Sequence, residues 1–315
     1  MKRFLRTLAR YLFVIVRWII RKLPYPVYKF SMIGFVAIGH CVMFKKRKIA
    51  MKTLKTAFGT DMDDAQIRKI ARQCFNNFGR GMIDLIYLID RPHLIKERVE
   101  IEGKHHLEDA LKAGNGAILL SAHFGNFILM YLRFVVEGYK TNVIMRRARD
   151  EEWEKTISEI RHSLGLHTIY ALPQRKCIEQ SLRVLRNNEM LFILLDQNFG
   201  GAGRIFVDFF GHKAATAAGP VVFSNRTGAP ILPLFIIRQK ADKHKIVINP
   251  PVNLEPGTGK DILTANVAKI TKIIEDCIRK YPHEWGGWMH NRWKSRTVEE
   301  QRVIDRMREK FDYIA

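Results

Sequence analysis

Residues 116–124 read GAILLSAHF, a mostly apolar run that begins at a glycine and has a histidine near its end. A short run without polar alternation is typical of a strand that is buried on both faces of a sheet. Similar runs follow at 142–147 (NVIMRR), 191–197 (LFILLDQ), 229–238 (APILPLFIIR) and 245–251 (KIVINPP), with helical patterns between the earlier ones. Strands that alternate with helices predict an α/β fold, with a mixed, mostly parallel sheet flanked by helices.

Polar side chains follow three of these predicted strands. His123 follows the first, Arg146 and Arg147 follow the second, and Asp196 with Gln197 follows the third. In open α/β sheets, ligands bind outside the carboxyl ends of the strands. We therefore expect these side chains to converge at one edge of the sheet.

The N-terminal part of the chain has a membrane-associating pattern. Residues 1–24 place five arginines on one side of a predicted helix and large aliphatic side chains on the other, which suits a lipid interface with anionic headgroups. The alternative is a packed amphipathic helix with a solvated face. A second apolar stretch at 30–44 precedes the basic cluster KKRK at 45–48, and it is shorter than the roughly 20 residues of a spanning helix.

These patterns predict two parts. Residues 1–48 form a membrane-associating helical segment, monotopic or single-span, and residues 49–315 form one catalytic α/β domain. Arginines interrupt the first apolar run and no small-residue cleavage site follows, so we do not expect a cleaved signal peptide. The lysines and arginines are expected to hold the domain on the cytoplasmic face.

The net charge points to an anionic partner. The chain has 53 lysines and arginines against 31 aspartates and glutamates, a formal charge of +22. Anionic membrane lipids, an acidic carrier protein, a phosphorylated substrate and nucleic acid all carry the required charge. No zinc-finger pattern, RNA-binding motif or leucine heptad accompanies the basic residues, so we expect no nucleic-acid partner. The acids and histidines lack ligand spacing, so we expect no metal.

Several segments, in one order, carry a resemblance to a known family. They are KRKIAMKTLKTAFG, SAHFGNF, MRRARDEEWEKTI, LLDQNFGGAGRIFVDFFGHKAATAAGP, RTGAPILPLFIIR and YPHEWGGWMHNRWKSR. Over nearly its whole length the chain resembles the bacterial lipid A biosynthesis acyltransferases, the lauroyl and myristoyl transferases of the lysophospholipid acyltransferase superfamily. The resemblance implies a glycerolipid acyltransferase-like fold, a place at the inner membrane in lipopolysaccharide biosynthesis, and acyl transfer to a glycolipid hydroxyl. Acyl carrier protein or coenzyme A would carry the acyl group, with no further cofactor.

The family signature is a histidine, four residues, then an aspartate or glutamate. His123 matches the histidine, the expected general base, and Gly125 and Asn126 match the turn, where backbone N–H groups are expected to stabilise an oxyanion. Ile128 occupies the place of the acid. An isoleucine there predicts a large loss of activity unless another carboxylate takes its role. The candidate substitutes are Glu137, Asp150, Glu151 and Asp196.

Further residues are expected around the site. A phosphate of the acceptor or of the carrier's phosphopantetheine arm is expected to bind Arg146, Arg147, Arg149 and Arg204, unless these are solvated surface charges. Asp196 and Gln197 are expected at the pocket rim, where they would hold the glycine-rich loop that follows at 200–203. An acyl groove, or ordinary core, is expected at Phe206, Phe209 and Phe210. The stretch WGGWMHNRWKSR at 285–296 favours a lipid-interface rim, or else packing that caps the domain.

Three functions remain open at this point. The first is a membrane-associated acyltransferase acting on an anionic glycolipid such as a lipid A precursor. The second is a catalytically impaired relative that binds lipid or carrier protein, which the isoleucine at position 128 favours. The third is an acyltransferase for a different glycolipid or an aminolipid.

Overall fold

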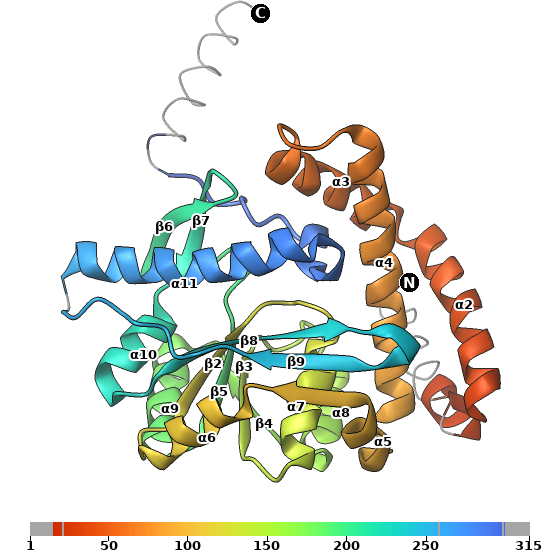
Figure 1. The fold of residues 1–315 in the computed structure, drawn as a ribbon, viewed down its shortest axis with the longest axis horizontal. Coiled ribbons are helices and arrows are strands. Elements are labelled where there is room, and N and C mark those ends of the chain that lie inside the picture. The colour runs from red at the N-terminus through yellow and green to blue at the C-terminus, as the bar shows by residue number, and fades with distance from the viewer. Residues whose placement is uncertain (1–14, 21, 258, 298, 300–315) are drawn as a thin grey trace, which may run out of the picture.

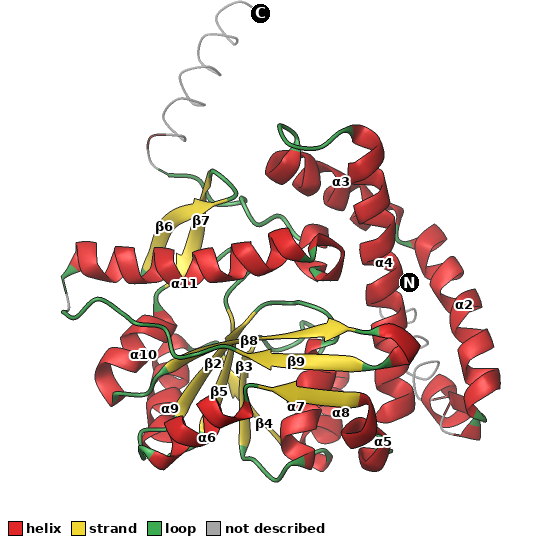
Figure 2. Ribbon diagram, in the orientation of Figure 1, coloured by secondary structure: helices red, strands yellow, loops and turns green. Residues whose placement is uncertain are grey.

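A seven-stranded sheet forms the centre of the protein, with helices on both faces (Figures 1 and 2). The computed structural model describes residues 15–20, 22–257, 259–297 and 299. The strand order is β1-β9-β8-β2-β5-β3-β4, and within this sheet the β8–β9 pair is antiparallel while the other pairs are parallel. The strands are β1 (Val99–Glu102), β2 (Ala117–Ser121), β3 (Thr141–Met145), β4 (Leu166–Tyr170), β5 (Met190–Leu194), β8 (Ile231–Arg238) and β9 (His244–Ile248). The predicted mixed, mostly parallel sheet flanked by helices is confirmed.

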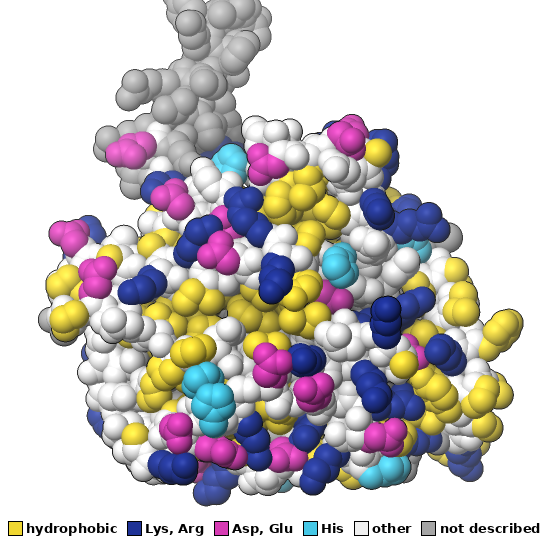
Figure 3. Space-filling view, viewed as in Figure 1, with side chains coloured by type: hydrophobic (Ala, Val, Ile, Leu, Met, Phe, Trp, Pro, Cys, Tyr) yellow, Lys and Arg dark blue, Asp and Glu magenta, His cyan; other side chains and the backbone are white. Residues whose placement is uncertain are grey.

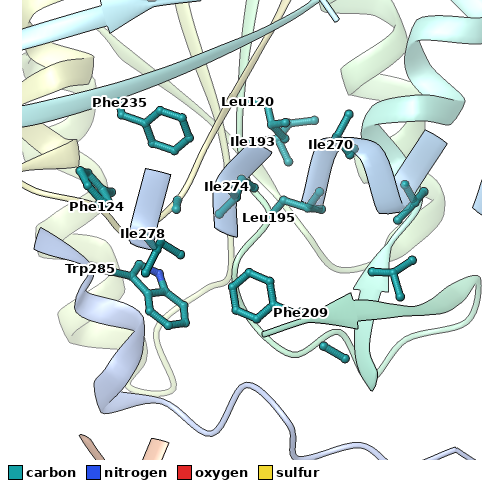
Figure 4. Close-up of a cluster of buried hydrophobic side chains, with 14 of the residues drawn as sticks. Leu120, Phe124, Ile193, Leu195, Phe209, Phe235, Ile270, Ile274, Ile278 and Trp285 are labelled. Atoms are coloured by element: carbon teal, nitrogen blue, oxygen red, sulfur yellow. The ribbon is translucent and has the colours of Figure 1, made fainter. Parts of the chain in front are cut away.

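Alternate side chains of the central strands point into two separate hydrophobic cores, one on each face of the sheet. In β2, Ile118 and Leu120 pack into one core, while Ala117 and Leu119 pack into the other. The first core lies under α9 (Gln174–Arg186), α10 (Gly219–Thr227) and α11 (Lys260–Lys280), and Figure 4 shows part of it. The second lies under α5 (Pro92–Arg98), α6 (Lys104–Lys112) and α7 (Phe127–Val136), while α8 (Glu151–Ser163) packs on β4. Burial on both faces explains why these strands read as continuous apolar runs.

A small antiparallel hairpin stands apart from the main sheet. It consists of β6 (Arg204–Phe209) and β7 (His212–Ala217), with Phe209 paired to His212 across the turn. Helix α11 packs along β6, so the hairpin lies on the outer side of that helix (Figure 1). Most of the segment after the predicted glycine-rich loop therefore belongs to this hairpin.

Three N-terminal helices flank one end of the sheet. They are α2 (Tyr25–Val42), α3 (Phe44–Phe58) and α4 (Asp64–Leu88), and α4 begins with a capping box formed by Asp63 and Gln66. The predicted boundary between residues 48 and 49 falls inside α3. Of the predicted N-terminal helix at 1–24, residues 15–20 are helical, and residues 1–14 and 21 lie outside the described part of the chain.

Helices α2 and α3 expose a set of large apolar side chains. These are Val27, Phe30, Ile33, Ile38 and Val42 on α2, and Phe44 and Ile49 on α3. Figure 3 shows apolar side chains gathered over α2. Within the described residues, no single helix has the length and apolar content to cross a membrane; α2 and α3 meet that test only together, as a pair bent by 78°.

A buried polar network fixes α2 to the α/β domain. The hydroxyl of Tyr28 donates to Asp84 of α4, and the same carboxylate forms an ion pair with Arg238 at the end of β8. The hydroxyl of Tyr25 donates to Asp242 at 2.7 Å. Because these groups are buried or half-buried and paired, separating α2 from the domain would leave polar groups without partners. The apolar face of α2 therefore has a fixed direction relative to the sheet.

Candidate active site

The register of two parallel strands brings His123 and Asp196 together. Ser121 of β2 pairs with Leu194 of β5, and the N–H of Leu195 donates to the carbonyl of Ser121 at 3.0 Å. His123 and Asp196 each lie two residues beyond the paired positions, so they leave the carboxyl edge of the sheet at the same level. The Nδ1 atom of His123 lies 2.9 Å from Oδ1 of Asp196.

Asp196 is a buried carboxylate, 2% exposed, with both oxygens engaged. Its Oδ2 accepts from the indole N–H of Trp285 at 2.7 Å and from the backbone N–H of His123 at 3.1 Å. Burial by itself raises the pKa of this carboxyl, but the charge of His123 and the hydrogen bonds outweigh it and lower the pKa to about 2. Asp196 is therefore an anion throughout the neutral range.

His123 combines a held nitrogen with an accessible one. Burial lowers the pKa of the imidazole, but the charge of Asp196 and the hydrogen bond to it outweigh this, and the pKa is raised. With the Nδ1 proton donated to Asp196, Nε2 carries the lone pair, and the side chain is 27% exposed. The amide Nε2 of Gln197 lies 3.2 Å from that nitrogen. This arrangement can accept a proton from a hydroxyl and stabilise the resulting imidazolium.

Ile128 takes no part in this pair. Its side chain is partly buried and packs against the apolar core on the α7 face of the sheet. Of the predicted substitutes, Glu137 binds Arg133 and Lys104, and Asp150 caps α8. Within the described residues, Asp196 is the carboxylate that reaches the imidazole. The sequence predicts Asp196 at the pocket rim. In the structure Asp196 is buried behind the imidazole, and the exposed Gln197 lies beside the accessible ring nitrogen.

The turn after His123 is held by its own hydrogen bonds. Gly125 has a φ of +53°, and its N–H donates to the carbonyl of Glu284 at 2.8 Å. The Oδ1 of Asn126 caps α7, and its Nδ2 donates to the carbonyl of Gly81 at 3.0 Å. These contacts show that both residues stabilise the turn. Because the Gly125 N–H already donates to Glu284, it is not a donor for an oxyanion, which corrects that prediction for Gly125.

We expect Gly125→Ala to lower the free energy of unfolding by about 2–4 kcal/mol, because left-handed strain and overpacking add. A Cβ at this position would lie 2.2 Å from the carbonyl oxygen of Ile236. Gly138 is the matched control, since its φ is +87° and a Cβ there would meet no atom within 4 Å. Thermal melting of the two alanine variants measures the difference; equal melting temperatures would show that the close approach at Gly125 has no cost.

Arg146, Arg147 and Arg149 follow β3 at the carboxyl edge of the sheet, whereas Arg204 begins β6 of the hairpin, and all four lie outside the His123 pair. Arg146 and Arg149 are exposed, the Arg147 guanidinium lies over the Tyr170 ring, and Arg204 contacts the carbonyl of Gly200. Within the described residues these four cations have no carboxylate partner at ion-pair distance. They are therefore free to bind an anion, and their binding role stays a prediction.

The predicted acyl-groove residues separate into two groups. Phe209 and Phe210 are buried in the first core, where Phe209 packs edge-on against Trp285 and Phe210 against Trp288. Their groove role is corrected to the alternative, ordinary core, because their rings are enclosed by other aromatic rings. Phe206 is partly buried on β6.

The C-terminal segment contributes residues that the sequence did not assign to the site. Trp285 and Trp288 are fully buried, which corrects the predicted lipid-interface rim in favour of packing. Arg292 is 1% exposed and donates to the carbonyls of Gln197 and Ala215. The only sequence signal for this role was the clustering of tryptophan and arginine, which does not say what the side chains contact.

Apolar and cationic groups border the exposed side of His123. Phe127 packs edge-on against the imidazole, with ring centroids 5.0 Å apart, and the exposed Phe78 of α4 lies near the His123 carbonyl across Gly286. On another side, Lys46 of α3 donates to the carbonyl of Met289, next to His290, whose ring centroid lies 6.3 Å from that of His123. Residues of α3 and α4 therefore lie near the site.

Comparisons with known proteins identify a family for this chain. The family described as Bacterial lipid A biosynthesis acyltransferase matches residues 2–295. The lipid A biosynthesis lauroyltransferase of Escherichia coli (strain K12) is 25% identical over 288 residues, which cover 89% of this chain and 90% of that protein. The lipid A biosynthesis palmitoleoyltransferase of the same strain is 25% identical over 296 residues, with 90% of each chain covered.

One further relative and one solved structure are also similar to this chain. The phosphatidylinositol mannoside acyltransferase of Mycobacterium tuberculosis (strain CDC 1551 / Oshkosh) is 26% identical over 213 residues, which cover 66% of this chain and 64% of that protein. Among solved structures, the 1-acyl-sn-glycerophosphate acyltransferase of Thermotoga maritima is 14% identical, with a TM-score of 0.37 and coverage of 75% of this chain and 95% of that one. The resemblance seen in the sequence is confirmed by the family match: the chain belongs to the bacterial lipid A biosynthesis acyltransferase family.

Proposed function

We propose that this protein is a membrane-associated O-acyltransferase with His123 as general base. It moves a fatty acyl group from the thioester of acyl carrier protein, or of coenzyme A, to a hydroxyl of an anionic glycolipid such as a lipid A precursor. The observation that carries the proposal is the hydrogen-bonded pair of His123 and the buried Asp196, at the carboxyl edge of the sheet, in a chain of this family.

The pair supports each step of the transfer. Nε2 of His123 takes the hydroxyl proton as the acceptor oxygen attacks the thioester carbonyl, and the Asp196 carboxylate stabilises the imidazolium that forms. Collapse of the tetrahedral intermediate breaks the carbon–sulfur bond, and the imidazolium returns its proton to the departing thiolate. The products are the acylated glycolipid and the free thiol.

The position of Asp196 argues against the catalytically impaired alternative. That alternative is based on Ile128, which occupies the place of the acid in the family signature. Asp196, two residues beyond the end of β5, does not depend on position 128, because it reaches Nδ1 from the loop after the neighbouring strand. This contact supports an active enzyme despite the isoleucine.

The surroundings of the site suit an amphiphilic, anionic acceptor. Exposed apolar side chains, Phe78 and Met82, lie on α4, and Val36 of α2 contacts the same helix at Gly79. This contact places the apolar surface of α2 beside the exposed apolar side chains of α4. Lys46 and the arginines at the sheet edge offer cations to phosphate groups, and the net charge of +22 suits an acidic carrier protein.

We expect Phe30→Asp to move the protein from the membrane fraction toward the soluble fraction, because Phe30 is 80% exposed at the centre of the apolar face of α2. Burying one such side chain in lipid contributes about 2 kcal/mol, so the loss predicts at least a tenfold weaker partition into vesicles with anionic lipids. Leu172→Asp is the matched control, since Leu172 is 68% exposed and follows β4 at the edge of the sheet. Flotation of both variants with vesicles measures the partition; equal partition would exclude α2 as the docking surface.

The experiment that tests the proposed function uses the purified full chain in detergent micelles. Two donors, an acyl-acyl carrier protein and an acyl-coenzyme A, are each offered with three acceptors: a lipid A precursor, a phosphatidylinositol mannoside and an aminolipid. Mass spectrometry of the products identifies the acceptor and the chain length. We expect ester formation on the lipid A precursor. Ester formation on another acceptor would support the alternative substrate, and no product with any pair would support the impaired alternative.

A further inference from the structure

We propose that Trp285 is a positioning residue for the His123–Asp196 pair, and that its indole N–H fixes the orientation of the Asp196 carboxylate against the imidazole. The inference rests on the proposed function, because it concerns the efficiency of the same general base. Trp285 is fully buried, and its Nε1 lies 2.7 Å from Oδ2 of Asp196. The two residues are far apart in the sequence, so the contact exists only in the folded chain.

Two donors hold the same oxygen of Asp196. The indole N–H of Trp285 and the backbone N–H of His123 both donate to Oδ2, at 2.7 and 3.1 Å. A carboxylate without such contacts can rotate about its Cβ–Cγ bond and turn its plane away from a neighbour. With Oδ2 held by two donors, the carboxylate plane is fixed with Oδ1 at 2.9 Å from Nδ1 of the imidazole. Both donors belong to the folded chain itself, so the base is preorganised.

The backbone on both sides of Trp285 is tied to the turn that carries His123. The N–H of Gly286 donates to the carbonyl of His123, and the N–H of Gly125 donates to the carbonyl of Glu284, both at 2.8 Å. Between them, Phe124 and Trp285 form an antiparallel bridge. Backbone hydrogen bonds therefore hold the segment that carries Trp285 against the turn that carries His123.

The indole itself has little room to rotate. A Cβ at position 287 would lie 2.1 Å from the Trp285 ring, so the backbone after Trp285 passes directly against the indole. The rings of Trp288 and Phe209 pack edge-on against it, with centroids at 4.4 and 5.7 Å. Figure 4 shows the Trp285 indole among the side chains of this core. Its N–H is therefore directed by packing.

The absence of an acid at position 128 increases the dependence on Trp285. Within the described residues, Asp196 is the carboxylate that contacts His123, so no second acid orients the imidazole. Loss of the indole N–H would let Asp196 rotate away from Nδ1. Its charge would then raise the pKa of His123 less than it does in the intact pair.

Other titratable groups face the pair and remain unchanged in the variants below. Burial and the charge of Asp196 raise the pKa of Tyr131, and burial lowers the pKa of Arg292. Burial, Lys46 and His123 lower the pKa of His290, while burial raises the pKa of Glu284. These groups are the same in every variant. If removal of the indole N–H alone shifts the pH profile, the shift is therefore due to that N–H.

The test compares Trp285→Phe with Trp288→Phe in the full chain. Trp288 is the matched control for the loss of a buried indole N–H: it is also fully buried, and its Nε1 also donates at 2.7 Å, but to the carbonyl of Pro282, outside the pair. Its ring packs against Trp285, and phenylalanine keeps an aromatic ring at that contact. We expect Trp285→Phe to lower kcat about 10- to 100-fold, as for loss of a hydrogen bond to a charged group, and Trp288→Phe to lower it less than about threefold. The acid limb of kcat/KM should move a few tenths of a unit to lower pH in Trp285→Phe alone.

Each outcome decides the inference. Equal rates and unshifted acid limbs in the two variants would overturn it and assign Trp285 to packing only. If Trp285→Phe does not fold, replacing Trp285 with benzothienylalanine keeps the bicyclic shape and removes only the N–H, and the same shift is expected. A wild-type protein that forms no ester with any donor and acceptor would instead refute the proposed function. The two failures are therefore distinguishable.

Discussion

Replacing Asp196 with asparagine should lower kcat for acyl transfer by about 10³- to 10⁴-fold while the fold is kept, by analogy with the aspartate of the serine-protease triad. The side chains have the same shape, so the amide oxygen of Asp196→Asn can still accept from Trp285 and from the backbone of His123. Its NH₂ group then faces Nδ1 of His123, which must become the acceptor. The ring proton moves to Nε2, and the base loses its lone pair on the side of the hydroxyl.

The Asp196→Asn variant should also change the pH dependence of the rate in a defined direction. The charge of Asp196 raises the pKa of His123, so its removal lowers that pKa, and the acid limb of kcat/KM should move to lower pH. Steady-state rates between pH 5 and 9 measure both the loss and the shift. A smaller rate with an unchanged acid limb would mean that Asp196 supports the fold without acting on the imidazole.

Ile128→Glu is the control for the position of the acid. In the wild-type background it should raise the rate less than threefold, because Asp196 already holds Nδ1, and it should lower the melting temperature. The reason for the second effect is that Ile128 packs against an apolar core, where a carboxylate lacks partners. A tenfold or larger gain in rate would show that Asp196 is not the working acid.

The sheet could be predicted because its central strands are buried on both faces. β2 and β5 read as continuous apolar runs, and β8 is apolar up to its last residue. β9 reads HKIVI, and its buried side chains alternate with partly buried ones. No such apolar run marks β1 and β4, which lie at the two edges of the sheet. β1 reads VEIE and β4 reads LHTIY, and both alternate with exposed polar residues. An edge strand with one exposed face is too short and too polar for an apolar run to mark it.

The residues of the candidate site could be predicted one by one, but the contact between them could not. His123 and Asp196 were both recognised from their positions after apolar runs. Their contact depends on β5 lying beside β2, and β3, which follows β2 in the chain, lies on the other side of β5. Strand order is a result of long-range packing, which no local pattern encodes. Trp285 was missed for the same reason, since its partner lies 89 positions away in the sequence.

Replacing His123 with alanine should remove nearly all acyl transfer, by about 10⁵-fold or more, because the base, the imidazolium and the hydrogen bond to Asp196 are lost together. The residual rate should not depend on pH near neutrality. His290→Ala is the matched control: the ring lies 6.3 Å from that of His123 and has no contact with Asp196 among the described residues, so its loss should change kcat less than fivefold. Initial rates by mass spectrometry measure both variants.

The same variant separates catalysis from binding. His123 lies at the carboxyl edge of the sheet, whereas the exposed apolar side chains lie on α2 and α3, so His123→Ala should bind anionic vesicles as the wild type does. Loss of turnover with unchanged vesicle binding would show that the imidazole acts in the chemical step. If His123→Ala instead kept its rate, or lost vesicle binding in parallel with its rate, the general-base assignment would be wrong. The carboxylate of Asp196, with no base to orient, would then be explained only as a hydrogen-bonding centre of the core.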